Sequence, residues 1–173
     1  MKILIIGNTG FIGKYLTRKL IDTGYEVAGM DVNPRPPKQN SYPFVLGNIL
    51  NPHHIMKAAS GVDMIINLAA KHHDFGISRG EFFEVNVKGT QNILECASKL
   101  GIKKFIFYST VAVYGEPKTY TTENTPLCPS TDYGQSKLAA EKKVHKWALE
   151  DPSRQAAIIR PTVVFGPDNF ANV

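Results

Sequence analysis

The sequence predicts an α/β protein in which a doubly wound parallel sheet carries helices on both of its faces. The chain opens with a short apolar run, residues 2–6, that stops at Gly7 as a strand buried on both sides does. A glycine-rich turn follows and leads into a helical pattern. Strand-like and helix-like segments then alternate along the chain, which indicates right-handed crossovers between parallel strands.

Apolar patterns and turn-forming residues place each element in order. Strands are expected at residues 2–6, 25–30, 43–46, 63–67, 105–109 and 156–159. Helices are expected at residues 11–23, 52–60, 81–100 and 130–149. Gly24 and Gly101 stop the first and third helices, and Pro52 suits the first turn of the second. Three prolines forbid regular structure in the loop 33–42.

The turn after the first strand reads Gly7-Asn8-Thr9-Gly10-Phe11-Ile12-Gly13, in the strand–turn–helix context of Rossmann-type dinucleotide-binding folds. We expect Gly7 to permit the tight turn, Gly10 to let the backbone approach a pyrophosphate, and Gly13 to allow close helix packing. The helix N-terminus offers amide donors and partial positive charge to phosphates. The spacing is GxxGxxG and not the commoner GxGxxG, so a purely structural turn is the alternative.

Asp31 follows the second predicted strand, 18 positions after Gly13. The acidic residue that binds the adenosine ribose is expected roughly 20 positions on. A carboxylate there accepts a hydrogen bond from a 2′-hydroxyl and repels a 2′-phosphate, which favours NAD over NADP. Arg35 is close in the sequence and keeps NADP as the less favoured alternative.

Tyr133 and Lys137 stand four positions apart, on one face of a predicted helix. A free phenol, with a pKa of roughly 10, is a poor base at neutral pH. A nearby ammonium favours the phenolate and makes a proton shuttle. Ser109 and Thr110 end a predicted strand, where a hydroxyl can hydrogen-bond a substrate oxygen. Chance spacing on a helix and a turn-forming hydroxyl pair are the alternatives for each feature taken alone.

Together these features resemble the extended short-chain dehydrogenase/reductases, the NAD-dependent epimerase/dehydratase family, and UDP-glucose 4-epimerases in particular. The resemblance runs along nearly the whole chain. It rests on the turn 7–13, Asp31, Asn67-Leu68-Ala69-Ala70, Asn86-Val87-Lys88-Gly89-Thr90, the segment 109–115, Tyr133-Gly-Gln-Ser-Lys137 with Ala140-Glu141, and Arg160-Pro161 with Phe165-Gly166-Pro167.

The resemblance implies a role for each matching residue. Thr110, Tyr133 and Lys137 would be catalytic, with Tyr133 the acid/base and Lys137 also holding the nicotinamide ribose. Hydride would pass transiently between a substrate carbon and NAD. The cofactor-binding residues implied are Gly7, Gly10, Phe11, Ile12, Gly13, Asp31, Asn48, Ile49, Leu68, Ala69, Ala70, Lys71, Asn86, Tyr133 and Lys137. Asn48 and Ile49 would flank adenine, and Asn86 would brace the site.

Departures from the family narrow the expected reaction. Val111 and Ala112 stand where 4,6-dehydratases carry Asp-Glu, so a dehydratase or decarboxylase is disfavoured and a 4-epimerase or simple carbonyl reductase is favoured. Val163 replaces an Asn that touches the substrate diphosphate in many epimerases, which speaks against a nucleotide sugar. Asn48 replaces an Asp beside adenine, a change of small effect. Family members continue into a substrate-binding lobe, so we expect the C-terminal lobe to be missing from a truncated chain.

Length and composition bound the remaining possibilities. The 173 residues suggest one domain, residues 1–173, and the 43% hydrophobic and 20% charged content is ordinary for a soluble protein. No apolar run reaches the roughly 18 residues that span a bilayer, and we expect a cytoplasmic protein. The net charge of +5 is scattered, which favours solvated surface over a nucleic-acid partner. The two cysteines suggest no disulfide framework, and Lys71-His72-His73-Asp74 reads as a polar loop near a cleft and not as a metal site.

Two hypotheses of different class follow. The first is an NAD-dependent 4-epimerase acting on a nucleotide sugar, with an oxidoreductase on a non-nucleotide substrate as its chemical alternative. The second is a non-catalytic NAD-binding module. The family also dimerises through helices that here span 81–100 and 130–149, so a homodimer is expected by resemblance.

Overall fold

The computed structural model describes residues 1–34, 42–72, 76–116 and 120–167. Six parallel strands form one sheet in the order β3-β2-β1-β4-β5-β6, and this order identifies a Rossmann-type, doubly wound fold. The strands are β1 Lys2–Ile6, β2 Glu26–Asp31, β3 Phe44–Leu46, β4 Met64–Asn67, β5 Lys104–Tyr108 and β6 Gln155–Ile159. The fold class expected from the alternating pattern is therefore confirmed.

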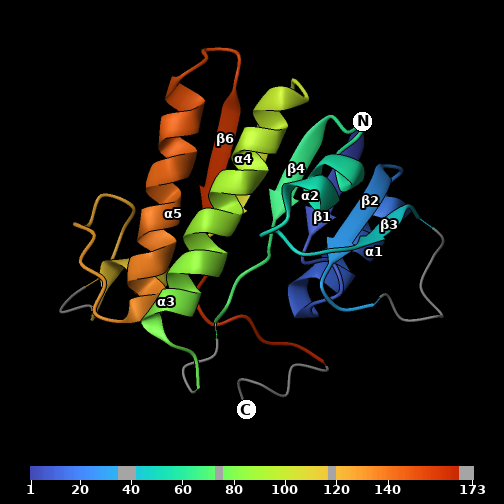
Figure 1. Ribbon diagram of the computed structural model, residues 1–173. Helices are drawn as coiled ribbons and strands as arrows, with labels where there is room; N and C mark the ends of the chain where they lie inside the picture. Colours follow the sequence, from blue (N-terminus) through green and yellow to red (C-terminus); the bar gives the residue numbers. More distant parts are fainter. Residues whose placement is uncertain (35–41, 73–75, 117–119, 168–173) are drawn as a thin grey trace.

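Helices lie on both faces of the sheet (Figure 1). The helical elements are α1 Phe11–Asp22, α2 Pro52–Ala58, α3 Arg79–Phe82, the π-helical η1 Phe83–Gly89, α4 Thr90–Lys99, the 3-10 turn η2 Val111–Tyr114 and α5 Asp132–Leu149. Apolar side chains of α2, α4 and α5 pack with one face of the sheet in the larger core. Leu16, Leu20 and Ile21 of α1 pack against Ile3, Ile5, Val27 and Ile66 on the other face.

The central strands are buried because they are covered on both sides. Ile3, Leu4, Ile5 and Ile6 of β1 are each at most 2% exposed, as the continuous apolar run predicted. In contrast, β6 lies at the edge of the sheet and three of its residues that follow Gln155 are exposed. In the described part of the chain, β6 is therefore an edge strand with exposed apolar side chains.

One expected helix has a different internal structure. The segment expected as a single helix over 81–100 starts earlier, at Arg79, and contains the π-helical turn η1. Ser78 caps this start, because its hydroxyl accepts from the Glu81 amide and Glu81 bonds back to the Ser78 amide. The 3-10 turn η2 was not expected from the sequence. The other elements begin and end within about two residues of their expected bounds, which is the usual uncertainty at element ends.

Candidate active site

Parallel pairing brings the predicted site segments to one edge of the sheet. Ile6 of β1 pairs with Met30 of β2 and Asn67 of β4, and Asn67 pairs with Phe107 of β5. The carboxyl ends of these four strands therefore lie side by side. The glycine turn, Asp31, residues 68–71 and Thr110 follow from these ends, at the edge where open α/β sheets bind ligands.

The glycine turn is as tight as the sequence suggested. Gly7 has a φ of +85°, and a Cβ there would lie 2.8 Å from the Ala69 nitrogen. A Cβ on Gly13 would lie 2.2 Å from the Gly7 carbonyl oxygen, so the first turn of α1 sits directly on the loop. Gly10 differs, because a Cβ there would meet only the Gly7 oxygen at 3.4 Å. Gly10 thus leaves space that the protein itself does not fill.

This contrast predicts opposite outcomes for two alanine variants. Gly13→Ala should destabilise the fold by about 1–3 kcal/mol, because its methyl group overlaps backbone atoms that cannot move away freely. Gly10→Ala should fold normally and lose affinity for NAD at least about tenfold, because its methyl group occupies the open side of the turn. Urea unfolding and calorimetric titration with NAD measure the two effects. A Gly13→Ala variant as stable as the wild type would contradict the packing argument.

Asp31 is buried at the end of β2 and holds the turn in shape. One carboxylate oxygen accepts from the Thr9 amide at 3.0 Å and the other from the Asn33 amide at 3.1 Å. Each oxygen keeps a second acceptor position, which suits a ribose hydroxyl. Arg35, considered as a counterweight that favours NADP, lies outside the described residues.

Asn86 links the segment that follows β4 to α5. Its side chain accepts from the Lys71 amide at 2.8 Å and donates to the Lys71 carbonyl at 3.0 Å. It also donates to the Ser136 hydroxyl at 2.9 Å, which in turn donates to the Tyr133 carbonyl at 2.7 Å. Asn86 lies in the π-helical turn η1, a type of irregularity that is frequent at functional sites. Leu68, Ala69 and Ala70 are half-buried and connect the end of β4 to Lys71, which Asn86 holds.

The two residues expected beside adenine have different surroundings. Asn48 is exposed, and its side-chain oxygen accepts from the Leu50 amide at 2.9 Å. Ile49 is 5% exposed and packs over Gly89, where a Cβ would lie 2.4 Å from the Ile49 Cδ1. The Ile49 side chain therefore serves the core, and contact of either residue with adenine stays a prediction.

Thr110 and Tyr133 lie on two elements that pack together, η2 and α5. Thr110 caps η2, with its hydroxyl accepting from the Ala112 amide at 3.2 Å. Tyr133 is half-buried in the first turn of α5, and its ring centroid is 6.0 Å from that of Phe82. Close packing holds the two elements, because a Cβ on Gly134 would lie 2.6 Å from the Ala112 carbonyl oxygen.

Among the titratable groups of the described residues, Lys137 has the pKa that lies furthest from its ordinary value. It is 2% exposed, donates to the Tyr108 carbonyl at 2.6 Å, and lies 4.2 Å from the centroid of the Phe107 ring. Burial lowers the pKa of its amine from the ordinary 10.5 to about 7, and the nearby Glu141 carboxylate opposes that change. An amine that titrates near neutral pH suits proton transfer.

Several contacts of the site had no counterpart in the sequence reasoning. Asn8, a residue of the glycine turn, is fully buried and its side-chain amide donates to the Tyr42 hydroxyl at 2.8 Å. Glu141 and Arg160 were noted only as parts of motifs, and the structure pairs them inside the protein. The position of Glu141, on the same helical face as Lys137 and Val144, is a signal that it is buried and has a partner, but the sequence does not identify Arg160 as that partner.

The segment after β6, residues 160–167, runs past the carboxyl ends of the strands (Figure 1) and is called the wall segment. Its Pro161 carbonyl accepts from the Val111 amide at 3.1 Å, and its Pro167 carbonyl accepts from the Tyr15 hydroxyl at 2.9 Å. A Cβ on Gly166 would lie 3.2 Å from the Phe11 ring. Phe11 and Ile12 in the first turn of α1 are half-buried, and the Phe11 ring lies beside this segment.

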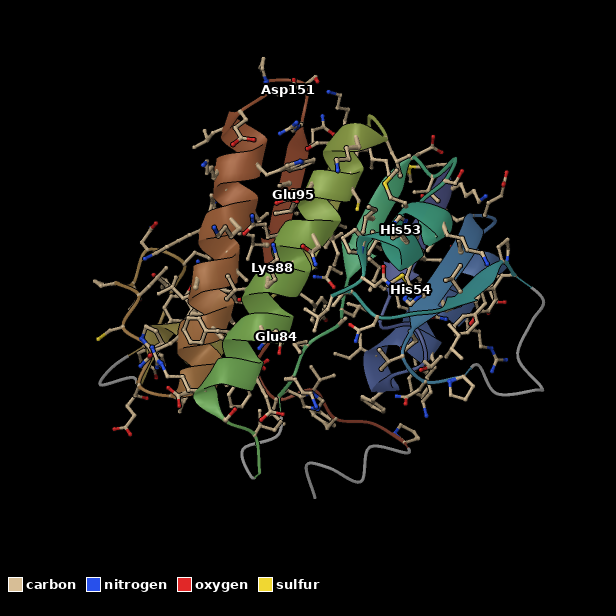
Figure 2. The ribbon with its side chains drawn as sticks, in the orientation of Figure 1. His53, His54, Glu84, Lys88, Glu95 and Asp151 are labelled. Atoms are coloured by element: carbon tan, nitrogen blue, oxygen red, sulfur yellow. The ribbon has the colours of Figure 1, made fainter. Side chains whose placement is uncertain are left out.

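The helical face expected to form a dimer is charged. Figure 2 shows Glu84, Lys88 and Glu95 along the outer side of η1 and α4, and all three are exposed. The homodimer stays a prediction. The described residues contain no group of three or more His, Cys, Asp and Glu that could hold a metal ion. His73 and Asp74 lie outside them. Among the described helices, none is long and apolar enough to cross a membrane.

Comparison with known proteins decides the family. The model of the NAD dependent epimerase/dehydratase family matches residues 3–173. The chain belongs to this family. It is 38% identical, over 99% of its length, to a protein of Escherichia coli O157:H7 named N-acetyl-alpha-D-glucosaminyl-diphospho-ditrans,octacis-undecaprenol 4-epimerase. It is 33% identical, over 98% of its length, to UDP-glucose 4-epimerase of Vibrio cholerae.

Solved structures of the family agree with this assignment. The chain matches the UDP-glucuronic acid 4-epimerase of Bacillus cereus in complex with NAD with a TM-score of 0.84 and 31% identity. That match covers 96% of this chain and 58% of the other. The two curated relatives are covered over 51% and 54% of their lengths. The chain therefore spans about half the length of its epimerase relatives.

Proposed function

We propose that the whole protein is an NAD-dependent 4-epimerase of a sugar that is linked through a diphosphate, with a nucleotide sugar as the leading substrate. The observation that supports this most is the joining of Thr110, Tyr133 and Lys137 through two packed elements at the carboxyl edge of the sheet. The relatives named above act as 4-epimerases on sugars of this kind.

The residues at the edge of the sheet fit NAD. Gly10 is the N-cap residue of α1 and provides no side-chain cap, so the amides of the first turn remain available to a pyrophosphate. The open side of Gly10 gives the backbone room to approach it, and the Asp31 carboxylate lies beside the turn to accept from the ribose. Held there, NAD would supply a reversible hydride acceptor for the sugar carbon, and return of the hydride to the opposite face of that carbon would invert its configuration.

The protein's own groups move the proton and hold the substrate. Tyr133 would take the proton from the sugar 4-hydroxyl, with Thr110 holding the oxygen and the Lys137 ammonium favouring the phenolate. Val111 and Ala112 provide no carboxyl group beside Thr110. A carbonyl produced at this position would thus meet no acid from η2 to expel water, which favours epimerisation over dehydration.

A direct assay tests whether the sugar of the substrate is linked to a nucleotide or to a polyprenol. UDP-glucose and UDP-N-acetylglucosamine are incubated with the whole protein and NAD, and the 4-epimers are separated by chromatography. N-acetylglucosaminyl diphosphoundecaprenol is the parallel substrate, because Val163 is an exposed apolar residue in the wall segment. Conversion of a nucleotide sugar supports the leading proposal, and conversion of the polyprenol substrate alone assigns the lipid carrier. No conversion of any of them would overturn the 4-epimerase proposal.

NAD preference is tested at Asp31. Asp31→Asn should weaken NAD binding by about tenfold and narrow the preference over NADP, because the charged acceptor and its repulsion of a 2′-phosphate are both removed. Calorimetric titration of this chain with each cofactor measures both effects. Asp22→Asn is the matched control, since Asp22 is exposed on α1 and pairs with Arg18. Equal discrimination in Asp31→Asn and wild type would contradict the assignment.

A further inference from the structure

A buried ionic cluster lies one helical turn from Lys137. Glu141 is 1% exposed on α5, and Arg160 holds its carboxylate with two hydrogen bonds, from Nε at 3.0 Å and from a terminal guanidinium nitrogen at 2.7 Å. The Ser109 hydroxyl donates to the same carboxylate at 2.5 Å. Three hydrogen bonds from two side chains in other parts of the fold thus fix one carboxylate inside the protein.

Arg160 also ties this carboxylate to the turn that carries Thr110. Its second terminal nitrogen donates to the Tyr114 hydroxyl at 2.6 Å, and its guanidinium lies 5.0 Å from the centroid of the Tyr114 ring. Tyr114 is the last residue of η2, and Thr110 caps the start of that turn. The pair therefore joins α5, η2 and the wall segment.

A contribution to stability does not by itself explain why this buried cluster is ionic. A buried ion pair is a weak source of stability, because desolvation offsets most of its attraction. A well-packed apolar pair would hold the same elements together. However, Glu141 stands at i+4 from Lys137 and both side chains are buried, so the two lie on one face of α5.

We propose that Glu141 is a positioning residue that raises the charged fraction of the buried Lys137 amine near neutral pH, and that Arg160 and Ser109 hold its carboxylate for this purpose. The effect of this charge on the proton step at Tyr133 rests on the proposed function. The interaction between Glu141 and Lys137 itself is measured without substrate.

Few other charges act at this place in the described structure. The Tyr108 carbonyl and the Phe107 ring of β5 contact the amine directly. Asn86 of η1 reaches α5 through the neutral Ser136. The other charged or titratable groups on elements packed against α5 are Arg79 and Glu81 of α3, Glu84 and Lys88 of η1, Glu95, Cys96 and Lys99 of α4, and Tyr114 of η2. On α5 itself they are Asp132, Tyr133, Lys142, Lys143, His145 and Lys146. Among the carboxylates of these elements Glu141 is the buried one, and Arg160 offsets part of its charge.

The test is the titration of Lys137 in this chain, followed by the 13Cε shift of labelled lysine and assigned with Lys137→Arg. Glu141→Gln keeps the shape and removes the charge, whereas Glu141→Asp keeps the charge and shortens the side chain. We expect Glu141→Gln to lower the titration midpoint by about one pH unit and Glu141→Asp to leave it near the wild-type value. Glu95→Gln, an exposed carboxylate on α4, is the control without effect.

The outcomes separate charge from packing. A midpoint unchanged in Glu141→Gln, or lowered as much in Glu141→Asp, would overturn the proposal. If Glu141→Gln does not fold, the 13C shift of the Glu141 carboxyl in the wild type decides. An ionised carboxylate throughout the titration of Lys137 supports the proposal, and a protonated one at neutral pH overturns it. Because no substrate is used, failure here is distinguishable from failure of the substrate assay.

Discussion

Replacing Tyr133 with phenylalanine should lower turnover of the whole protein by about 100- to 10,000-fold and leave NAD binding nearly unchanged. The variant loses only the hydroxyl, so the ring keeps its place beside Phe82, 6.0 Å away between centroids. The hydrogen-bonded chain from Asn86 through Ser136 ends on the backbone carbonyl of residue 133 and also survives. What disappears is the group that takes the proton.

This result is read from two measurements on the same preparation. Turnover of the best substrate from the carrier assay is compared with NAD affinity by calorimetry, and Tyr120→Phe serves as the control because Tyr120 is fully exposed. Turnover within a few-fold of wild type would remove Tyr133 from the acid/base role. Loss of NAD binding together with turnover would show that the hydroxyl supports the cofactor and not the proton step.

Local sequence signals were sufficient for most of the fold. The run of residues 2–6 predicted a strand covered on both sides, and β1 is the third strand of six with neighbours on each side. Gly7, Gly10 and Gly13 occupy the turn with the close approaches that their spacing implied at Gly7 and Gly13. These features are predictable because each depends on a few neighbouring residues and on strand burial.

The remainder depends on contacts between distant segments. The π-helical turn η1 follows the same amphipathic pattern as an α-helix, so periodicity does not distinguish them. Its Asn86 contacts Lys71 and Ser136, 15 and 50 positions away. Likewise, Glu141 and Arg160 meet only after α5 and β6 have packed, and no spacing between positions 141 and 160 predicts an ion pair. Such pairings follow from tertiary structure and are invisible to local reasoning.

Lys137 should make the stability of the protein rise with pH across the alkaline range. Burial lowers the pKa of its amine from 10.5 to about 7 in the folded state. Between these values the unfolded chain binds a proton that the folded chain has lost, so stability increases as pH rises. Below about 7 both states bind the proton and the contribution of this group no longer changes. One proton corresponds to about 1.4 kcal/mol per pH unit, or roughly 4 kcal/mol over three units.

The prediction is tested by urea unfolding of wild type and Lys137→Met at several pH values from 6 to 10. The wild type minus variant difference in unfolding free energy should climb through this range, because the exposed groups that titrate there are common to both chains and cancel. Lys88→Met is the control, since Lys88 is exposed on η1 and its difference should stay flat. A flat difference for Lys137→Met would mean that the amine keeps its proton when buried. A rising difference would show that the protein gives up stability at neutral pH to keep a titrating amine one helical turn from Tyr133.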